Sequence, residues 1–392
     1  MAFLEEYQND LIIEFTNSNE TYGQLAQEIE LVFTSSLKQL QIIFTTNKTK
    51  SFNQKMNEVI QKLKQKINES YLNPFRFDLV QQSSQVSQSE SCYAIAINKC
   101  CSTMVAGCDS KIKVFEFKEE MLKQIQILDE HKDYVTTLNF MKNQNQFLSG
   151  SYDSSVIIWQ NEQNNQWISQ QKLNGMTICI NCLIVNNNED LIVLGCYDRT
   201  IQFWMKENQW LCQQAITDHS SSVYGLSLNQ QQNRIISCGY DNQILIIEQS
   251  QQNKQWIVIQ KIKVEQYGYR ICFTDYNMFT FQPFDKEQMS IFEMSTIDKQ
   301  QIEIQHISVK GISDYNCFFP QQYIKSKCIL VNKNGEYANL IRKKQNGEFL
   351  TQQSIHFGTS NLFGVMSEDG VYLITWDDKS KQIQIRKYNE EE

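Results

Sequence analysis

The stretch Gln146-Phe-Leu-Ser-Gly-Ser-Tyr-Asp153-Ser-Ser-Val-Ile-Ile-Trp159 decides the fold, because residues 103–115, 190–204 and 234–247 repeat it. Each copy holds an apolar run, a tight turn with an Asp, and a second apolar run, which predicts two strands joined by a turn. The turn residues Asp109, Asp153, Asp198 and Asp241 are 44, 45 and 43 residues apart. Four strands of about 5–6 residues with short turns need that length, so the period predicts one four-stranded blade per repeat.

Weaker copies extend the period toward the end of the chain. Asp285 follows Asp241 by 44 residues, and further turns are expected at residues 334–335 and 377–378. These turns bring the number of units to seven. The last three units are degenerate, so six blades are the competing count.

Two more strands recur at fixed places in the stronger units. Runs at residues 135–140, 180–185 and 223–228 each begin 18 positions before the turn Asp. A Gln-Trp pair opens another strand at Trp167, Trp210 and Trp256. Period, register and order therefore agree from one unit to the next.

These residues resemble the WD-repeat family of β-propellers over about residues 75 to 388. The resemblance implies an all-β fold, with a seven-bladed WD-repeat β-propeller at residues 75–392. No unit ends in the literal Trp-Asp pair of the family, and this departure bears on the blade count.

The family resemblance also implies a structural network of His, Ser or Thr, turn Asp and Trp in each blade. The second unit matches best, with His131, Ser149 or Ser151, Asp153 and Trp159. The fourth unit has His219, Ser237 and Asp241 but Ile247 at the Trp position, whereas the third has Asp198 and Trp204 without the His. Buried polar groups must be paired, so these residues are expected to order turns rather than to catalyse a reaction.

Ring closure is a separate expectation. Propellers of this family often complete the last blade with a strand from the opposite terminus. Here residues 382–387 are expected to complete their own blade, and residues 75–80 to form the outer strand of the first blade. Residues 81–91, rich in Gln and Ser, are expected to form a loop.

The N-terminal segment, residues 1–74, has helical periodicity. Its apolar stripe consists of Phe52, Met56, Val59, Ile60, Leu63 and Ile67, and a second helix is expected over residues 22–44. The stripe is short for an independent coiled coil. Two antiparallel helices, or a helix docked on the propeller, are therefore expected; a homodimerising or partner-binding coiled coil is the alternative.

Composition excludes several classes of function. The net charge of -8 argues against nucleic acid as a partner. No run approaches the roughly 20 apolar residues that span a bilayer, and no secretory signal is evident. The 12 Cys are therefore expected to be inert thiols in the cytoplasm, with the nucleus as an alternative. No phosphate loop, nucleophile elbow or metal motif occurs, so no cofactor and no catalysis are expected.

The family resemblance places partner-binding positions just before each turn Asp and at the start of each first strand. Tyr dominates these positions, and Tyr suits protein interfaces. The predicted partner-binding residues are Tyr93, Tyr134, Tyr152, Tyr197, Tyr224 and Tyr240.

The predicted function is therefore a non-catalytic scaffold that binds a protein or peptide on one propeller face. The Trp-centred connectors look somewhat like those of the WD-repeat subunit of the cytosolic iron–sulfur assembly targeting complex, which makes iron–sulfur protein assembly one alternative. A structural subunit of a cytoskeletal or ciliary complex, dimerised by the N-terminal helices, is another.

Overall fold

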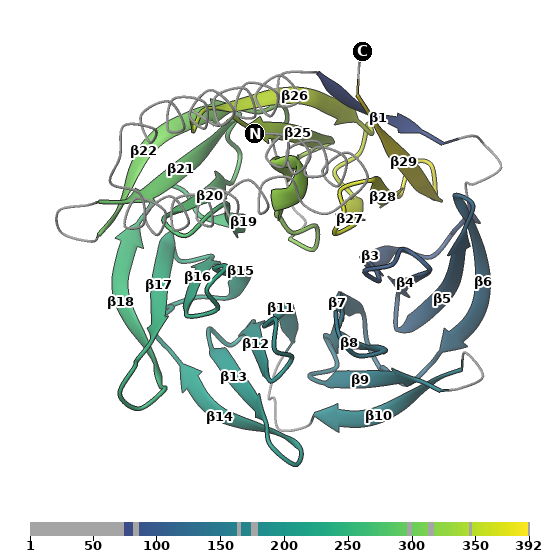
Figure 1. Ribbon diagram of the computed structural model, residues 1–392, viewed down its shortest axis with the longest axis horizontal. Helices are drawn as coiled ribbons and strands as arrows, with labels where there is room; N and C mark the ends of the chain where they lie inside the picture. Colours follow the sequence, from purple (N-terminus) through teal and green to yellow (C-terminus); the bar gives the residue numbers. More distant parts are fainter. Residues whose placement is uncertain are drawn as a thin grey trace, which may run out of the picture.

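The computed structural model describes residues 74–80, 86–162, 166–173, 179–295, 300–312, 317–344 and 347–390. Within these residues the chain forms seven antiparallel sheets, arranged as blades of a ring (Figure 1). The expected seven-bladed all-β propeller is therefore confirmed, and a count of six is wrong. The predicted N-terminal helices lie outside the described residues. None of the described residues forms a helix long and apolar enough to cross a membrane.

The blades follow one another in chain order. The first three are β3 (Cys92–Ile97), β4 (Thr103–Cys108), β5 (Lys111–Lys118) and β6 (Met121–Leu128); β7 (Val135–Phe140), β8 (Gln146–Ser151), β9 (Val156–Asn161) and β10 (Trp167–Leu173); β11 (Ile180–Val185), β12 (Leu191–Cys196), β13 (Ile201–Lys206) and β14 (Trp210–Ile216).

The next three blades are β15 (Val223–Leu228), β16 (Arg234–Gly239), β17 (Gln243–Gln249) and β18 (Trp256–Lys263); β19 (Gly268–Phe273), β20 (Met278–Pro283), β21 (Gln288–Met294) and β22 (Gln301–Ser308); β23 (Gln322–Ile324), β24 (Ile329–Asn334), β25 (Tyr337–Lys343) and β26 (Phe349–His356), with the 3-10 turn η2 (Lys325–Lys327). The seventh comprises β27 (Leu362–Met366), β28 (Tyr372–Asp377), β29 (Gln382–Glu390) and β1 (Phe75–Leu79), with β2 (Val86–Ser87) also paired to β29.

Burial explains the sequence pattern of the strands. Second strands such as β8 and β12 are buried at every residue, because each lies between two strands of its own sheet and between two neighbouring blades. They therefore read as continuous apolar runs. Outer strands such as β10 alternate between buried and more exposed residues, because one face meets solvent.

The predicted turns lie where the repeat places them. Asp109 directly follows β4, Asp153 lies between β8 and β9, and Gly335 separates β24 from β25. The runs predicted at residues 135–140, 180–185 and 223–228 are β7, β11 and β15. The repeat thus predicted the period, and also the register of the second to fourth blades; in the first blade Asp109 follows its strand by one residue instead of two.

Ring closure differs from the expectation. β1 pairs with β29, with Phe75 opposite Glu390 and Leu79 opposite Arg386, so residues 75–79 complete the last blade and not the first. The first blade already has an outer strand, β6, which the sequence pattern had not identified. Phe75 and Phe77 decide the matter physically, because both are buried in the core between the sixth and seventh blades.

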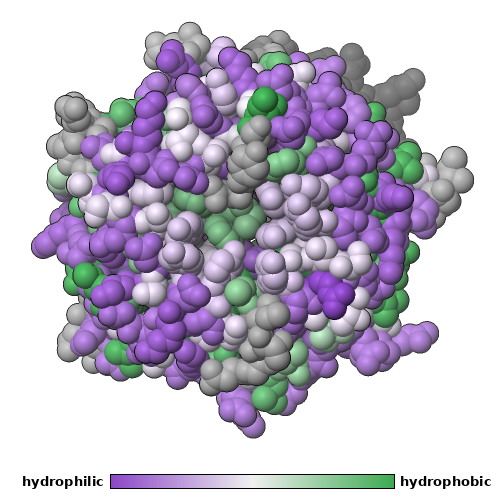
Figure 2. Space-filling model, turned by 180° about the vertical axis from the view of Figure 1, so that it is seen from behind, coloured by the Kyte–Doolittle hydropathy of each residue, from purple (hydrophilic) through white to green (hydrophobic). Residues whose placement is uncertain are grey.

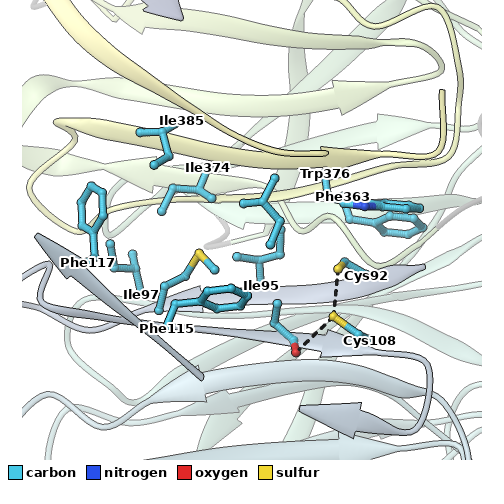
Figure 3. Close-up of a cluster of buried hydrophobic side chains, with 13 residues drawn as sticks. Cys92, Ile95, Ile97, Cys108, Phe115, Phe117, Phe363, Ile374, Trp376 and Ile385 are labelled. Atoms are coloured by element: carbon cyan, nitrogen blue, oxygen red, sulfur yellow. Dashed lines mark hydrogen bonds between the residues drawn. The ribbon is translucent and has the colours of Figure 1, made fainter. Parts of the chain in front are cut away.

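The seam between the last and first blades is a packed apolar cluster. Figure 3 shows Ile374, Trp376 and Ile385 of the last blade facing Ile95 and Phe115 of the first. The indole nitrogen of Trp376 also donates a hydrogen bond to the carbonyl of Gln88, 2.9 Å away. The ring is therefore closed by both strand pairing and side-chain packing.

The sixth blade is irregular at its inner edge. Its first strand, β23, has only three residues and follows Pro320, which lacks the amide hydrogen that a sheet needs. A side chain adds one bond inside this blade, because Gln321 donates to the Oδ1 atom of Asn332 at 2.8 Å, and Asn332 in turn donates to Gln282 of the fifth blade at 2.7 Å. Just before Pro320, Phe318 packs against Tyr93 of the first blade, with ring centroids 6.0 Å apart.

Candidate protein-binding face

One end of the ring carries the turns between second and third strands together with the loops that enter each first strand. We call this end the turn face. The two sets of loops share an end because the strands of each blade are antiparallel. Figure 2 shows this face: near-white and pale green residues gather around the centre, and purple, hydrophilic residues lie farther out.

In the second blade a buried polar network lies beneath the turn face. The Nδ1 atom of His131 is 2.9 Å from Asp153 Oδ2, and its Nε2 atom is 2.7 Å from Ser149 Oγ. Trp159 donates its indole hydrogen to the same Ser149 oxygen at 2.8 Å. Ser149 therefore completes the set, whereas Ser151 donates to the carbonyl of Asp133. Ser149 and His131 are both buried, which suits a structural role better than nucleophilic attack.

The carboxyl group of Asp153 is strongly acidic in this network. Burial acts to raise its pKa, but hydrogen bonds from His131, Ser155 and the Lys132 amide outweigh that effect and hold the pKa below its usual range. Asp153 also accepts a hydrogen bond from the Ser155 amide at 3.0 Å, so the charged form organises the turn.

The fourth blade repeats the arrangement with one member missing. His219 Nδ1 lies 2.9 Å from Asp241 Oδ2, and Nε2 lies 2.9 Å from Ser237 Oγ. Ile247 occupies the Trp position and is buried, so Ser237 has no indole donor. Burial again acts to raise the pKa of Asp241, but the hydrogen bond to His219, the charge of His219 and the amides of Ser220 and Gln243 together lower it.

The third blade does not bring its two predicted residues together. Asp198 accepts hydrogen bonds from the amide and the hydroxyl of Thr200, at 3.0 and 2.6 Å. Trp204 instead donates to Gln202, 3.1 Å away. This blade has no His at the network position, and hydrogen bonds between Asp198 and Thr200 order its turn.

The predicted tyrosines lie on the turn face, and the first group of them belongs to the first two blades. The ring centroids of Tyr93 and Tyr134 are 4.9 Å apart, and those of Tyr134 and Tyr152 are 6.4 Å apart. Phe318 joins them, at 6.0 Å from Tyr93 and 5.9 Å from Tyr152. Phe318 comes from the segment before Pro320 and reaches across the centre from the sixth blade.

A second group surrounds Tyr224 and Tyr240. Tyr240 lies 4.2 Å from Tyr267, and Tyr224 lies 5.0 Å from Tyr269, measured between ring centroids. Phe284 stacks on Tyr267 at 4.8 Å. Burial raises the pKa of Tyr224 to about 12, so its phenol stays neutral and keeps its hydrogen-bond donor at ordinary pH.

Tyr197, just before Asp198 of the third blade, lies between the two groups in blade order, and its carbonyl accepts a hydrogen bond from the Ser222 hydroxyl at the entry to the fourth blade, 3.0 Å away. We call the resulting row the tyrosine arc; its members are Tyr93, Tyr134, Tyr152, Tyr197, Tyr224, Tyr240, Tyr267 and Tyr269. The most exposed rings on it are those of Tyr134, Tyr197 and Tyr240, at 44%, 54% and 51%.

Sequence reasoning missed four aromatic residues of this face. Phe284 precedes Asp285 as Tyr240 precedes Asp241, so the position of Asp285 could have revealed it. Tyr269 is the second residue of β19, as Tyr224 is of β15, but it lies 16 residues before its turn Asp instead of 17. Tyr267 precedes Tyr269 by two residues and could have been found from the same register. Phe318 had no such signal, because its place depends on how the chain leaves the sheet at Pro320.

A central channel of ≈ 660 Å³ runs behind the arc, lined by the first strands of the blades. Hydrogen bonds tie neighbouring blades together along its wall: Thr136 donates to the carbonyl of Ile180 at 2.6 Å, and Asn181 donates to the carbonyl of Val223 at 3.0 Å. Among the residues that the structure describes, no group of three or more His, Cys, Asp or Glu side chains is placed to hold a metal ion.

Comparison with known proteins agrees with this geometry. Residues 122–160, 167–205 and 210–248 match the family model described as "WD domain, G-beta repeat". No curated protein sequence matches the chain. Each matched range holds the outer strand of one blade and the first three strands of the next, as in β6 with β7, β8 and β9.

Because the outer strand of each blade belongs to the repeat that follows it, the last blade has no following repeat to supply its outer strand. β1, from the other end of the described chain, takes that place by pairing with β29. Matched repeats, blade geometry and interlocked ends together show a seven-bladed β-propeller that carries WD40 repeats over residues 122–160, 167–205 and 210–248.

Proposed function

We propose that the chain is a non-catalytic scaffold that binds a protein or peptide partner on its turn face. The observation that supports this proposal is the tyrosine arc, which continues over five adjacent blades. Rings such as Tyr134, Tyr197 and Tyr240 combine large apolar area with a polar tip and lose little conformational entropy on binding, which suits interface anchors. A WD40 propeller is typically a protein-interaction scaffold, and here the arc is the surface that suits that role.

The polar sets beneath the arc favour a scaffold over an enzyme. His131, Ser149 and Asp153 lie in a hydrogen-bonded set that Trp159 completes from within the core. A hydrolytic nucleophile would have to reach substrate, and buried Ser149 does not. These residues are therefore proposed to hold the turns that present the tyrosines.

Affinity purification of the full-length chain followed by mass spectrometry tests the proposal. Tyr134, Tyr197 and Tyr240 are replaced together by Ala; their exposure means that folding is expected to survive. The matched control replaces Ile257 and Ile259, exposed residues of the outer strand β18, by Ala. Loss of the recovered partner in the tyrosine variant and its retention in the control would support the turn face. Equal recovery from both variants would rule it out.

The iron–sulfur assembly alternative rested on the Trp-centred connectors, and packing accounts for those residues. Trp167, Trp210 and Trp256 are all buried at the start of an outer strand. Trp167 lies 4.9 Å from Phe147, and Trp256 stacks on Phe203 at 5.3 Å, between ring centroids. The connectors thus give no separate reason to prefer that function. A cytoskeletal or ciliary role through the N-terminal segment depends on residues outside those described.

A further inference from the structure

A buried cation lies between the sixth and seventh blades and forms no ion pair with a carboxylate among the residues that the structure describes. Arg342, near the end of β25, is 3% exposed. Its Nη2 atom donates to the Tyr388 hydroxyl at 3.3 Å, and its guanidinium carbon lies 4.6 Å from the centroid of the Phe75 ring. Its Nε atom is buried and makes no hydrogen bond with any described residue. Buried charges are ordinarily paired, so this guanidinium is an exception that needs an explanation.

A second cation contacts the same tyrosine. The Nζ atom of Lys327, the last residue of η2, lies 3.9 Å from the centroid of the Tyr388 ring. Burial lowers the pKa of Lys327; the charges of Glu390 and Asp369 act to raise it, and the charge of Arg342 adds a smaller lowering effect. Lys327 and Arg342 thus approach one aromatic ring, one over its face and one at its hydroxyl.

The site is accessible at its edge. Tyr388 and Lys327 are half-buried, whereas Glu390 is exposed. The Tyr388 hydroxyl donates to Glu390 Oε1 at 2.6 Å, so a carboxylate from the surface already reaches the hydroxyl that Arg342 touches. Glu390 itself makes no ion pair with either cation among the described residues. Its position nevertheless shows that an oxygen anion fits beside the ring.

We propose that Lys327, Arg342 and Tyr388 form a binding site for an oxyanion, a phosphate or carboxylate group that takes the place of the Glu390 side chain. The guanidinium and the ammonium supply charge-assisted donors, and such donors suit the oxygens of both groups. The aromatic rings of Phe75 and Tyr388 hold the cations in place while the site is empty. This site lies between the sixth and seventh blades and is independent of the tyrosine arc.

Thermal melting of the full-length protein tests the proposal. The buffers contain sodium phosphate, sodium acetate or sodium chloride at equal ionic strength. The wild type is expected to show a saturable rise in Tm with phosphate or acetate over chloride, and the stronger of the two identifies the oxyanion. Arg342→Met and Lys327→Met are each expected to weaken binding, so that the concentration of oxyanion at half-saturation rises at least tenfold. Lys132→Met, a lysine of the turn face, is the matched control and is expected to leave the response unchanged.

The variants also separate an anion site from mere packing. In the empty site no anion balances the charge of Lys327, so removing that charge should not destabilise the protein. Lys327→Met is therefore expected to have a Tm in chloride alone that is no lower than that of the wild type. Glu390→Gln removes the competing carboxylate and is expected to tighten phosphate binding. A Tm response that is equal in the wild type and in both Met variants would overturn the proposal. The proposal would also be overturned if Lys327→Met melted at a lower temperature than the wild type in chloride and phosphate did not raise the Tm of the wild type.

Discussion

Replacing Ser149 by Ala would test how the polar network of the second blade supports the fold. The hydroxyl serves two buried partners at once, the Nε2 atom of His131 and the indole nitrogen of Trp159. The substitution removes one oxygen and leaves both partners without a hydrogen bond. An orphaned buried group costs about 1–3 kcal/mol, so two such groups predict a loss of about 2–6 kcal/mol in the free energy of unfolding.

The fourth blade provides the matched comparison. Ser237 contacts His219 at 2.9 Å, but Ile247 stands where the indole would be. Ser237→Ala therefore orphans one group and should cost about 1–3 kcal/mol, roughly half the loss at Ser149. Both serines are fully buried, so differences in exposure do not confuse the comparison.

Urea denaturation followed by far-ultraviolet circular dichroism measures both losses, with thermal melting as a second probe. Each kcal/mol lowers Tm by about 2–4 °C in a domain of 150–250 residues, and by somewhat less in a larger one. Near-equal losses for the two variants would refute the reasoning, because the Trp159 hydrogen bond would then contribute nothing. A smaller loss for Ser149→Ala than for Ser237→Ala would refute it more strongly.

Three further predictions concern acid, backbone and closure. The pKa of Asp153 is lower in the folded state than in the unfolded state, where it is about 3.9. The charged Asp153 therefore stabilises the fold above that pH, and this stabilisation is lost as the pH falls below it. In urea titrations at several pH values, the free energy of unfolding of Asp153→Asn should fall less steeply with acid than that of the wild type. Gly335 has a φ of 53°, and a Cβ added there would lie 2.1 Å from the Ile312 carbonyl oxygen. Gly347 also has a positive φ, 86°, but no atom lies within 4 Å of an added Cβ. Gly335→Ala should therefore destabilise the protein more than Gly347→Ala, and equal melting temperatures of the two variants would contradict this. Phe77→Ala should cost about 3–5 kcal/mol because it empties a core position of the closing strand; a loss under about 1 kcal/mol in urea would show that β1 is dispensable.

The candidate site was only partly predictable. The six tyrosines were found because they hold fixed positions relative to a turn Asp that the repeat itself reveals. The structure adds that Tyr134, Tyr197 and Tyr240 are well exposed, whereas Tyr152 is packed against Phe318. Exposure depends on which neighbours arrive from other blades, and the repeat contains no information about that.

The sequence by itself determined the local units of this protein: strand order, turn positions and the polar sets at His131 and His219, while the structure decided between six and seven blades. These features follow from contacts within one period, where spacing and residue type are enough. Tertiary structure alone decided the rest, namely the pairing of β1 with β29, the reach of Phe318 across the ring centre and the meeting of Lys327 with Arg342 at Tyr388. Each of these joins residues from different repeats or opposite ends of the chain. Such contacts are set by the closure of the ring and by packing between blades, which no local pattern encodes.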